Sequence, residues 1–189
     1  MMNILFLAFS KYADFEIAHP LFFLRKVGKA SVTTCTLDGN PVESIAGLIT
    51  MPQFALEKVH VEKYDLILLP GGDGIAEIMN EPSIHALLKQ AHSLEIPIAS
   101  ICASAVLLGK AGILDGVNFT CTQGTYNHFN VAFKNGIYTG SNIEVGTGFI
   151  TAQGTAFAEF AVEVGKMVGL WSDNAQAQKA LRFCKGEIV

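Results

Sequence analysis

Short apolar runs alternate along this chain with segments of helical periodicity. The apolar runs are typical of β-strands and occupy five segments: Asn3–Phe9, Ala30–Thr36, Tyr64–Leu69, Pro97–Ile101 and Gly148–Ala152. Residues 66 to 69 are apolar without interruption, so that strand is expected to be covered by helices on both faces. The alternation predicts an α/β protein, a three-layer sandwich with a mostly parallel, doubly wound sheet and helices on both faces.

Two helices are expected to pack on this sheet. The first is predicted near Phe15–Val27, where Pro20 would leave the carbonyl of Glu16 without its usual donor and so produce an irregular turn at Glu16. The second is predicted over Thr155–Gly169. It has a core-facing side made of Phe157, Phe160, Ala161, Val164 and Val168.

The segment Thr36–Thr50 is predicted to be a small hairpin inserted after the second strand, with Asp38-Gly39-Asn40-Pro41 as its turn residues. The sequence contains no repeat, linker or low-complexity tract. A chain of 189 residues suits one well-formed core, so a single domain over residues 1–189 is expected.

Composition and charge narrow the classes of partner. A formal charge of −4 and a pI near 5.7 give no basic surface, so nucleic acid is not an expected partner, whereas small molecules or proteins are. The apolar runs are far shorter than the ~20 residues of a membrane span. Residues 1–9 have neither a basic n-region nor a cleavage site, so secretion is not expected. The four scattered cysteines form no C-x-x-C pair, so we expect free thiols in the reducing cytoplasm.

Cys102 is the strongest candidate for chemistry. It follows the apolar run Pro97–Ile101 and opens a helix-like run, with the small residues Ser100 and Ser104 on either side, which is the pattern of a nucleophile elbow. A thiol at a helix start faces free N–H groups and the positive end of the dipole, which predicts a lowered pKa and a larger thiolate fraction. The alternative is a buried core thiol, the commoner fate of a free cysteine.

Two further loops should lie beside Cys102, because sites in α/β sheets form at the carboxyl ends of the strands. The glycines of the segment 70–74 can direct N–H groups into a cavity, although an ordinary strand-to-helix turn explains them equally well. Glu16 could share a proton with Cys102 and then have a raised pKa, whereas a solvated glutamate at a helix start is the alternative. His19 with Glu16 is too small a set for a metal site, so no metal is expected.

Four motifs in this order resemble the DJ-1/ThiJ/PfpI superfamily: Phe15-Glu16, Leu69-Pro70-Gly71-Gly72, Ser100-Ile101-Cys102-Ala103 and Gln153-Gly154-Thr155-Ala156-Phe157. The resemblance spans nearly the whole chain. It implies a flavodoxin-like sheet of the class I glutamine amidotransferase type, a homodimer, and an oxidation-prone Cys102 hydrogen-bonded by Glu16. The residues expected at the oxyanion and substrate site are Gly71, Gly72, Asp73, Ala103 and Thr122.

Two positions depart from the family pattern. Ala103 stands where the protease-like branch has a histidine directly after the cysteine, so peptidase chemistry of that type is not expected. Thr122 and Gln123 stand where other members have histidine or tyrosine and then proline. His128 is then the candidate third partner, with a solvated loop histidine as the alternative.

These observations leave two functions open. In the first, the Cys102 thiolate attacks a small dicarbonyl such as methylglyoxal, or its protein adduct, while Glu16 moves protons, as in a glyoxalase or deglycase. In the second, the protein is a non-catalytic sensor or protector in oxidative stress, with Cys102 oxidised to sulfinic acid. Flavin binding is disfavoured because residues 10–14 lack a phosphate cradle and carry Asp14, so no cofactor is expected.

Overall fold

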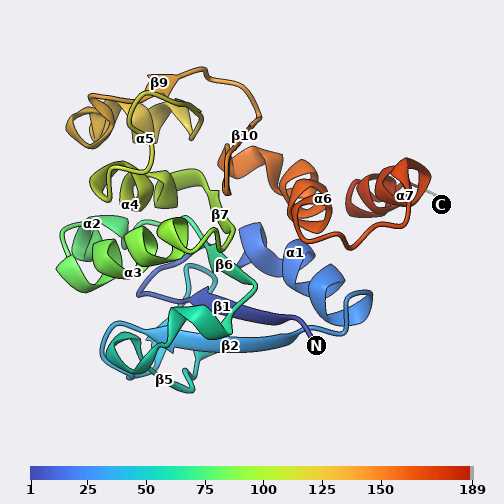
Figure 1. Cartoon of the computed structure of the whole chain (residues 1–189), viewed down its shortest axis with the longest axis horizontal. Helices are drawn as coiled ribbons and strands as arrows, with labels where there is room; N and C mark the ends of the chain where they lie inside the picture. Colours follow the sequence, from blue (N-terminus) through green and yellow to red (C-terminus); the bar gives the residue numbers. More distant parts are fainter. Residues whose placement is uncertain (188–189) are drawn as a thin grey trace.

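A seven-stranded sheet forms the centre of the computed structural model, which describes residues 1–187 (Figure 1). The strand order is β10-β11-β7-β6-β1-β2-β5, and every pairing is parallel except that of β10 with β11. The predicted mostly parallel α/β sheet is therefore confirmed. Its strands are β1 (Asn3–Leu7), β2 (Ser31–Thr36), β5 (Phe54–Ala55), β6 (Leu66–Leu69), β7 (Ile98–Ile101), β10 (Ile143–Gly146) and β11 (Phe149–Ala152).

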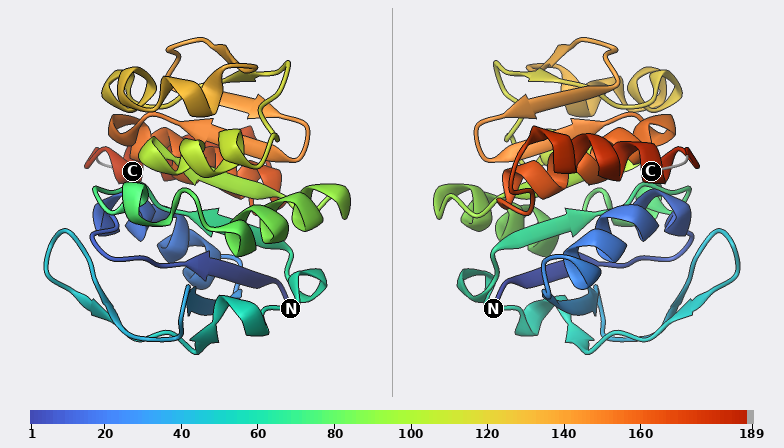
Figure 2. Two further views of the ribbon diagram at one scale, coloured as in Figure 1. Left: turned by 90° about the vertical axis from the view of Figure 1, so that its left-hand side faces the viewer. Right: turned by 90° about the vertical axis from the view of Figure 1, so that its right-hand side faces the viewer.

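Helices cover both faces of the sheet (Figures 1 and 2). On one side lie α1 (Asp14–Lys26), α6 (Phe157–Met167) and α7 (Asn174–Cys184), and on the other lie α2 (Ile75–Ile78), α3 (Pro82–Ser93) and α4 (Ala105–Lys110). The remaining elements are α5 (Gln123–His128), the parallel pair β8 (Asn118–Phe119) and β9 (Ile137–Tyr138), and 3₁₀ turns at Leu56–Lys58, Val61–Lys63, Cys102–Ser104, Asn130–Phe133 and Gly154–Ala156.

The core lies between these layers. All residues of β6, β7 and β11 are buried because helices cover them on both faces, which explains the uninterrupted apolar sequence of β6; β7 and β11 each bury one hydroxyl residue, Ser100 and Thr151. The five predicted strands are all present. β1 ends two residues earlier than predicted, and the other four strands begin one or two residues later than predicted. The predicted late helix begins at Phe157 after a 3₁₀ turn. Its Phe160, Ala161 and Val164 are buried as expected, whereas Phe157 and Val168 are only partly buried.

The predicted irregular turn at Glu16 is wrong. Helix α1 is continuous, with Pro20 buried inside it and Glu16 in its first turn. Proline removes only the one N–H that would reach the Glu16 carbonyl, and the packing of α1 against α6 holds the helix together across that gap. Glu16 therefore projects from a regular and well-supported helix start.

The predicted hairpin is present, but its turn lies elsewhere. β3 (Val42–Glu43) pairs with β4 (Ile49–Thr50), so residues 44–48 make the turn, and the segment 38–41 only leads into the hairpin. The hairpin (cyan in Figure 2) projects from the body of the molecule and is anchored by the Ser44 hydroxyl, which donates to Asp14 Oδ2 at 2.6 Å. This anchor brings the hairpin turn to the start of α1.

Within residues 1–187 no helix is long and apolar enough to cross a membrane. The four cysteines are all free; Cys35 and Cys121 are buried, whereas Cys102 and Cys184 are partly exposed.

Candidate active site

The loops after β1, β6 and β7 meet at the carboxyl edge of the sheet, because these three strands are neighbours. The Ala13 N–H donates to the Gly71 carbonyl at 2.8 Å, and Tyr12 forms an isolated bridge with Gly72. Backbone hydrogen bonds thus join the loop after β1 to the loop after β6, which places the start of α1 beside the glycine segment.

Cys102 occupies the elbow that its sequence context predicts. Its φ is +59°, a conformation that non-glycine residues rarely adopt and that costs about 1–3 kcal/mol, and it opens the 3₁₀ turn before α4. The Ser104 hydroxyl holds this turn by accepting the Ile101 N–H at 3.1 Å and lying 3.0 Å from the Leu69 carbonyl. The thiol packs against the core on one side but is partly exposed and lines a cavity, so Cys102 is not a fully buried core thiol.

Glu16 is the buried partner of this thiol. Only 2% of its surface is exposed, its Oε2 accepts the Gly71 N–H at 2.7 Å, and its carboxyl shares a hydrogen bond with Cys102. The Gly71 N–H therefore positions Glu16 and does not serve the oxyanion role that we expected of it.

Two glycines leave the space that this pair needs. A Cβ on Gly71 would lie 2.6 Å from both Cys102 Cβ and Glu16 Oε2, and one on Gly154 would lie 2.8 Å from Glu16 Oε1 and 2.9 Å from Cys102 Sγ. Any larger residue at either position would force the carboxyl and the thiol apart. The close approach of Glu16 to Cys102 therefore depends on glycine on both sides.

Both acids of the pair have raised pKa values. Burial raises the pKa of Glu16 from 4.5 to about 7. Burial, together with the neighbouring Glu16 charge, raises the pKa of Cys102 to about 12, so the lowered pKa predicted from the helix start is wrong. The dipole of a single 3₁₀ turn is outweighed by the loss of water, and between these two values the pair carries one negative charge and one shared proton.

Thr122 supplies a third contact to the sulfur. Its Oγ1 lies 3.3 Å from Cys102 Sγ and accepts the Gly154 N–H, also at 3.3 Å. Since the N–H occupies one side of the oxygen, the hydroxyl hydrogen is available to the sulfur. A hydroxyl can donate to a thiolate in this way, but it does not take up a proton at neutral pH as an imidazole would.

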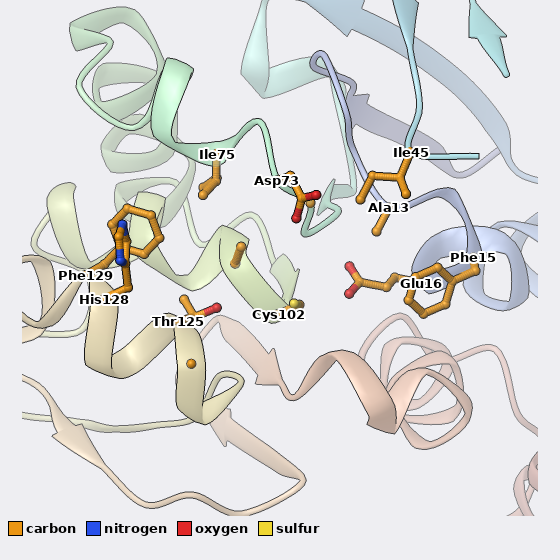
Figure 3. Close-up of a pocket in the computed structure, with 13 residues that line it drawn as sticks. Ala13, Phe15, Glu16, Ile45, Asp73, Ile75, Cys102, Thr125, His128 and Phe129 are labelled. Atoms are coloured by element: carbon orange, nitrogen blue, oxygen red, sulfur yellow. The ribbon is translucent and has the colours of Figure 1, made fainter. Parts of the chain in front are cut away.

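A cavity of about 430 Å³ opens in front of the pair (Figure 3). Of the residues expected from the sequence, those that line it are Glu16, Gly72, Asp73, Cys102, Ala103 and His128. Gly71 and Thr122 lie outside this lining and act on Glu16 and on the sulfur instead. His128 lies at the end of the cavity away from Glu16, with its ring edge-on to Phe129 at 4.5 Å between centroids.

Sequence patterns did not indicate the apolar wall of this cavity. Its main members are Ile45, Ile75 and Phe129, accompanied by Ala13, Phe15, Gly124 and Thr125. Ile45 comes from the hairpin turn, Ile75 from the start of α2 and Phe129 from the end of α5, so no local motif links them. His19, by contrast, stacks on Phe157 at 5.7 Å between centroids, and the described residues contain no group of three metal-ligating side chains.

Comparisons with known proteins agree with this geometry. The sequence profile of the DJ-1/PfpI family matches residues 2–167. A deglycase from Pyrococcus horikoshii is 27% identical over 65% of this chain and 74% of its own. A glutathione-independent glyoxalase from Caenorhabditis elegans is 31% identical over 66% of both chains. The crystal structure of a DJ-1 superfamily protein from Agrobacterium tumefaciens superposes with a TM-score of 0.85 and 26% identity, covering 98% of each chain.

The shared proton predicts how the reactivity of Cys102 depends on pH. We expect its rate of alkylation by iodoacetamide to rise through about pH 7, because Glu16 must lose its own proton before it can accept that of the thiol. Peptide mass spectrometry across pH 5–10 measures this rate. Glu16→Gln should remove the step near pH 7, whereas Glu163→Gln on the surface of α6 should retain it. A step of the same position and size in Glu16→Gln would contradict the coupling.

Proposed function

The chain belongs to the DJ-1/PfpI family, and we propose that it acts on small reactive aldehydes or their adducts, with Cys102 as the nucleophile and Glu16 as its proton partner. The observation that carries this proposal is the buried Glu16–Cys102 pair at the floor of an accessible cavity. A nucleophile, a general acid/base and backbone donors are the three components that covalent carbonyl chemistry needs. Relatives named as a deglycase and a glyoxalase support the same class of chemistry.

The first step is addition to the aldehyde. Glu16 takes the thiol proton, Cys102 Sγ bonds to the aldehyde carbon, and the carbonyl oxygen receives the proton back from Glu16, giving a hemithioacetal. The Ala103 N–H is hydrogen-bonded to the sulfur and favours its thiolate form. The Gly72 backbone lines the same cavity and can stabilise the developing oxyanion.

The second step is an internal redox change that needs no added oxidant. Glu16 removes the proton from the former aldehyde carbon and a proton is returned to the adjacent carbonyl carbon, while the hydroxyl proton of the hemithioacetal passes to the oxygen of that adjacent carbon. The first carbon is thereby oxidised to a thioester and the second is reduced to an alcohol. Water then cleaves the thioester and releases the thiol. With methylglyoxal and one water the product is lactate, which balances the reaction.

The contacts of the sulfur favour this chemistry over peptide cleavage. A peptidase needs a second acid to protonate the departing amine, and imidazole is absent from positions 103 and 122 of this chain. Of the two side chains that contact the sulfur, Thr122 does not exchange a proton at neutral pH, so proton transfer at the sulfur depends on Glu16. One carboxyl is sufficient for a step that removes and returns a proton within the same substrate.

Turnover of methylglyoxal tests this function. Wild-type protein should form lactate, Cys102→Ser should abolish its formation, and Glu16→Gln should lower kcat by about 100-fold or more because the carboxyl that shares a proton with Cys102 is lost. Cys184→Ser, which removes the other partly exposed thiol, is the matched control and should retain full activity. Undiminished lactate formation by Cys102→Ser would contradict the proposal.

A second function, redox sensing through Cys102, rests on the unequal exposure of the thiols. Cys35 and Cys121 are fully buried, whereas Cys102 is partly exposed beside a carboxyl that is protonated below about pH 7. A protonated Glu16 can donate a hydrogen bond to a sulfinate oxygen, and the Thr122 hydroxyl can do the same. In this role no turnover is required.

Mild peroxide distinguishes selective oxidation from general damage. We expect mass spectrometry to find two added oxygens on Cys102 before any appear on the other three cysteines, because burial shields two of them and no carboxyl shares a proton with Cys184. Equal oxidation of Cys184 and Cys102 would remove the sensor function.

We also propose a homodimer in the cytoplasm. The support for the dimer is an exposed apolar surface on the hairpin, where Leu48 and Ile49 are 59% and 64% exposed and Ile45 and Met51 accompany them. A two-stranded hairpin has no core in which to bury such side chains, and single folded chains rarely expose contiguous apolar patches of this kind. Phe15 of α1 continues the surface next to the anchored hairpin turn.

Light scattering after size-exclusion chromatography tests the dimer. The wild-type protein should have twice the mass of one chain, and the double substitution Leu48→Ser with Ile49→Ser should yield monomers, since it removes the apolar surface. Val131→Ser, at a residue that is 77% exposed on a different part of the fold, should remain dimeric. A monomeric wild type would refute this assembly.

A further inference from the structure

We propose that the cavity selects uncharged α-oxoaldehydes that carry an apolar substituent and rejects those with a negative charge. The inference rests on the proposed function and names the substrate class of that site. It is based on the charges and the shape of the residues around Cys102, which come from five separate segments of the chain (Figure 3).

The cavity lining carries negative charge and no permanent cation. It contains two carboxyl groups, Glu16 and Asp73, neither lysine nor arginine, and one imidazole, His128, at the end away from Glu16. Lys11, from the loop after β1, lies outside this lining; it lines a neighbouring hollow that Asp73 and Ile45 share, and it pairs with Glu77 at 3.8 Å. A substrate with a negative charge would need a nearby cation to offset that charge. The lining of this cavity contains no lysine or arginine that could do so.

Asp73 is the residue that sets this selection. It follows Gly72 in the glycine segment, and Figure 3 shows its carboxylate directed into the cavity, toward the space in front of Cys102 and Glu16. An anionic group on a substrate would have to approach both this carboxylate and the negative charge shared by the catalytic pair. Asp73 is itself exposed, so water and salt partly screen its repulsion, which adds to the repulsion from the buried pair, where screening is weaker.

Apolar side chains form much of the remaining lining. Ile45, Ile75 and Phe129 face the cavity from three different elements, and Phe15 closes the side next to Glu16. A volume of about 430 Å³ exceeds what methylglyoxal fills, so a larger substituent can bury apolar surface against these side chains. An aromatic ring next to the dicarbonyl suits both the size and the composition of this wall.

Substitutions of Asp73 and of the apolar side chains should change the substrate preference in different ways. Removing the charge of Asp73 changes how substrates of equal size but different charge are ranked. Shortening Ile75 changes how uncharged substrates of different size are ranked. Both effects are ratios between substrates for the same enzyme, so differences in folding or active fraction cancel.

A matched pair of aldehydes tests the charge selection. At pH 8, 4-carboxyphenylglyoxal is anionic, whereas its methyl ester has the same ring and the same reacting carbonyls without the charge. We expect wild-type kcat/KM to favour the ester by at least tenfold, and Asp73→Asn to lower that preference by roughly tenfold through loss of one nearby charge. Asp115→Asn, which removes an exposed carboxylate that lines a different hollow, should leave the preference unchanged.

A second comparison tests the apolar wall. Wild-type protein should prefer phenylglyoxal to methylglyoxal in kcat/KM, and Ile75→Ala should reduce this preference about tenfold, because the ring loses a contact that methylglyoxal never makes. Retention of the preference in Ile75→Ala would show that the wall does not select the substrate.

The outcomes separate this inference from the function on which it rests. Turnover of methylglyoxal with equal kcat/KM for the acid and the ester would overturn the charge selection and leave the proposed function intact. An ester preference that Asp73→Asn does not move would overturn the assignment to Asp73. Absence of turnover with every aldehyde would overturn both the inference and the proposed function.

Discussion

The Glu16–Cys102 pair is the interaction on which the rest of this site depends. Two acids held together away from water cannot both ionise at neutral pH, so they share one negative charge and one proton. This arrangement keeps a base next to a nucleophile without a histidine. It also explains why glycine is needed at 71 and 154, since a Cβ at either position would enter the space between the two groups.

Burying this pair lowers the free energy of unfolding at neutral pH. The folded-state pKa of Glu16 is raised, from 4.5 to about 7, so its stabilising contribution is fully present below pH 4.5 and is lost as pH rises through 7. The loss is on the order of 3 kcal/mol, a large part of the stability of an ordinary domain. The buried sheet and its two helical layers must offset this loss and also hold the strained φ of Cys102.

The surroundings of the pair then restrict the chemistry. Thr122 and the Ala103 N–H contact the sulfur as donors, so they can favour a thiolate but cannot carry a proton away from it. The wall of Ile45, Ile75 and Phe129 and the carboxylate of Asp73 determine which molecules can approach. The segments at the strand ends thus supply the reactive groups. Most of the side chains that select the substrate come from the hairpin, α2 and the end of α5.

The sequence by itself determined the parallel sheet, the elbow at Cys102 and the meeting of the glycine segment with Glu16, because apolar periodicity, turn residues and strand order are local or topological properties. The tertiary structure alone decided that α1 continues through Pro20, that Thr122 and not His128 contacts the sulfur, and that the pKa of Cys102 is raised. These features depend on burial and on distances between segments remote in sequence, which no local pattern of residues encodes.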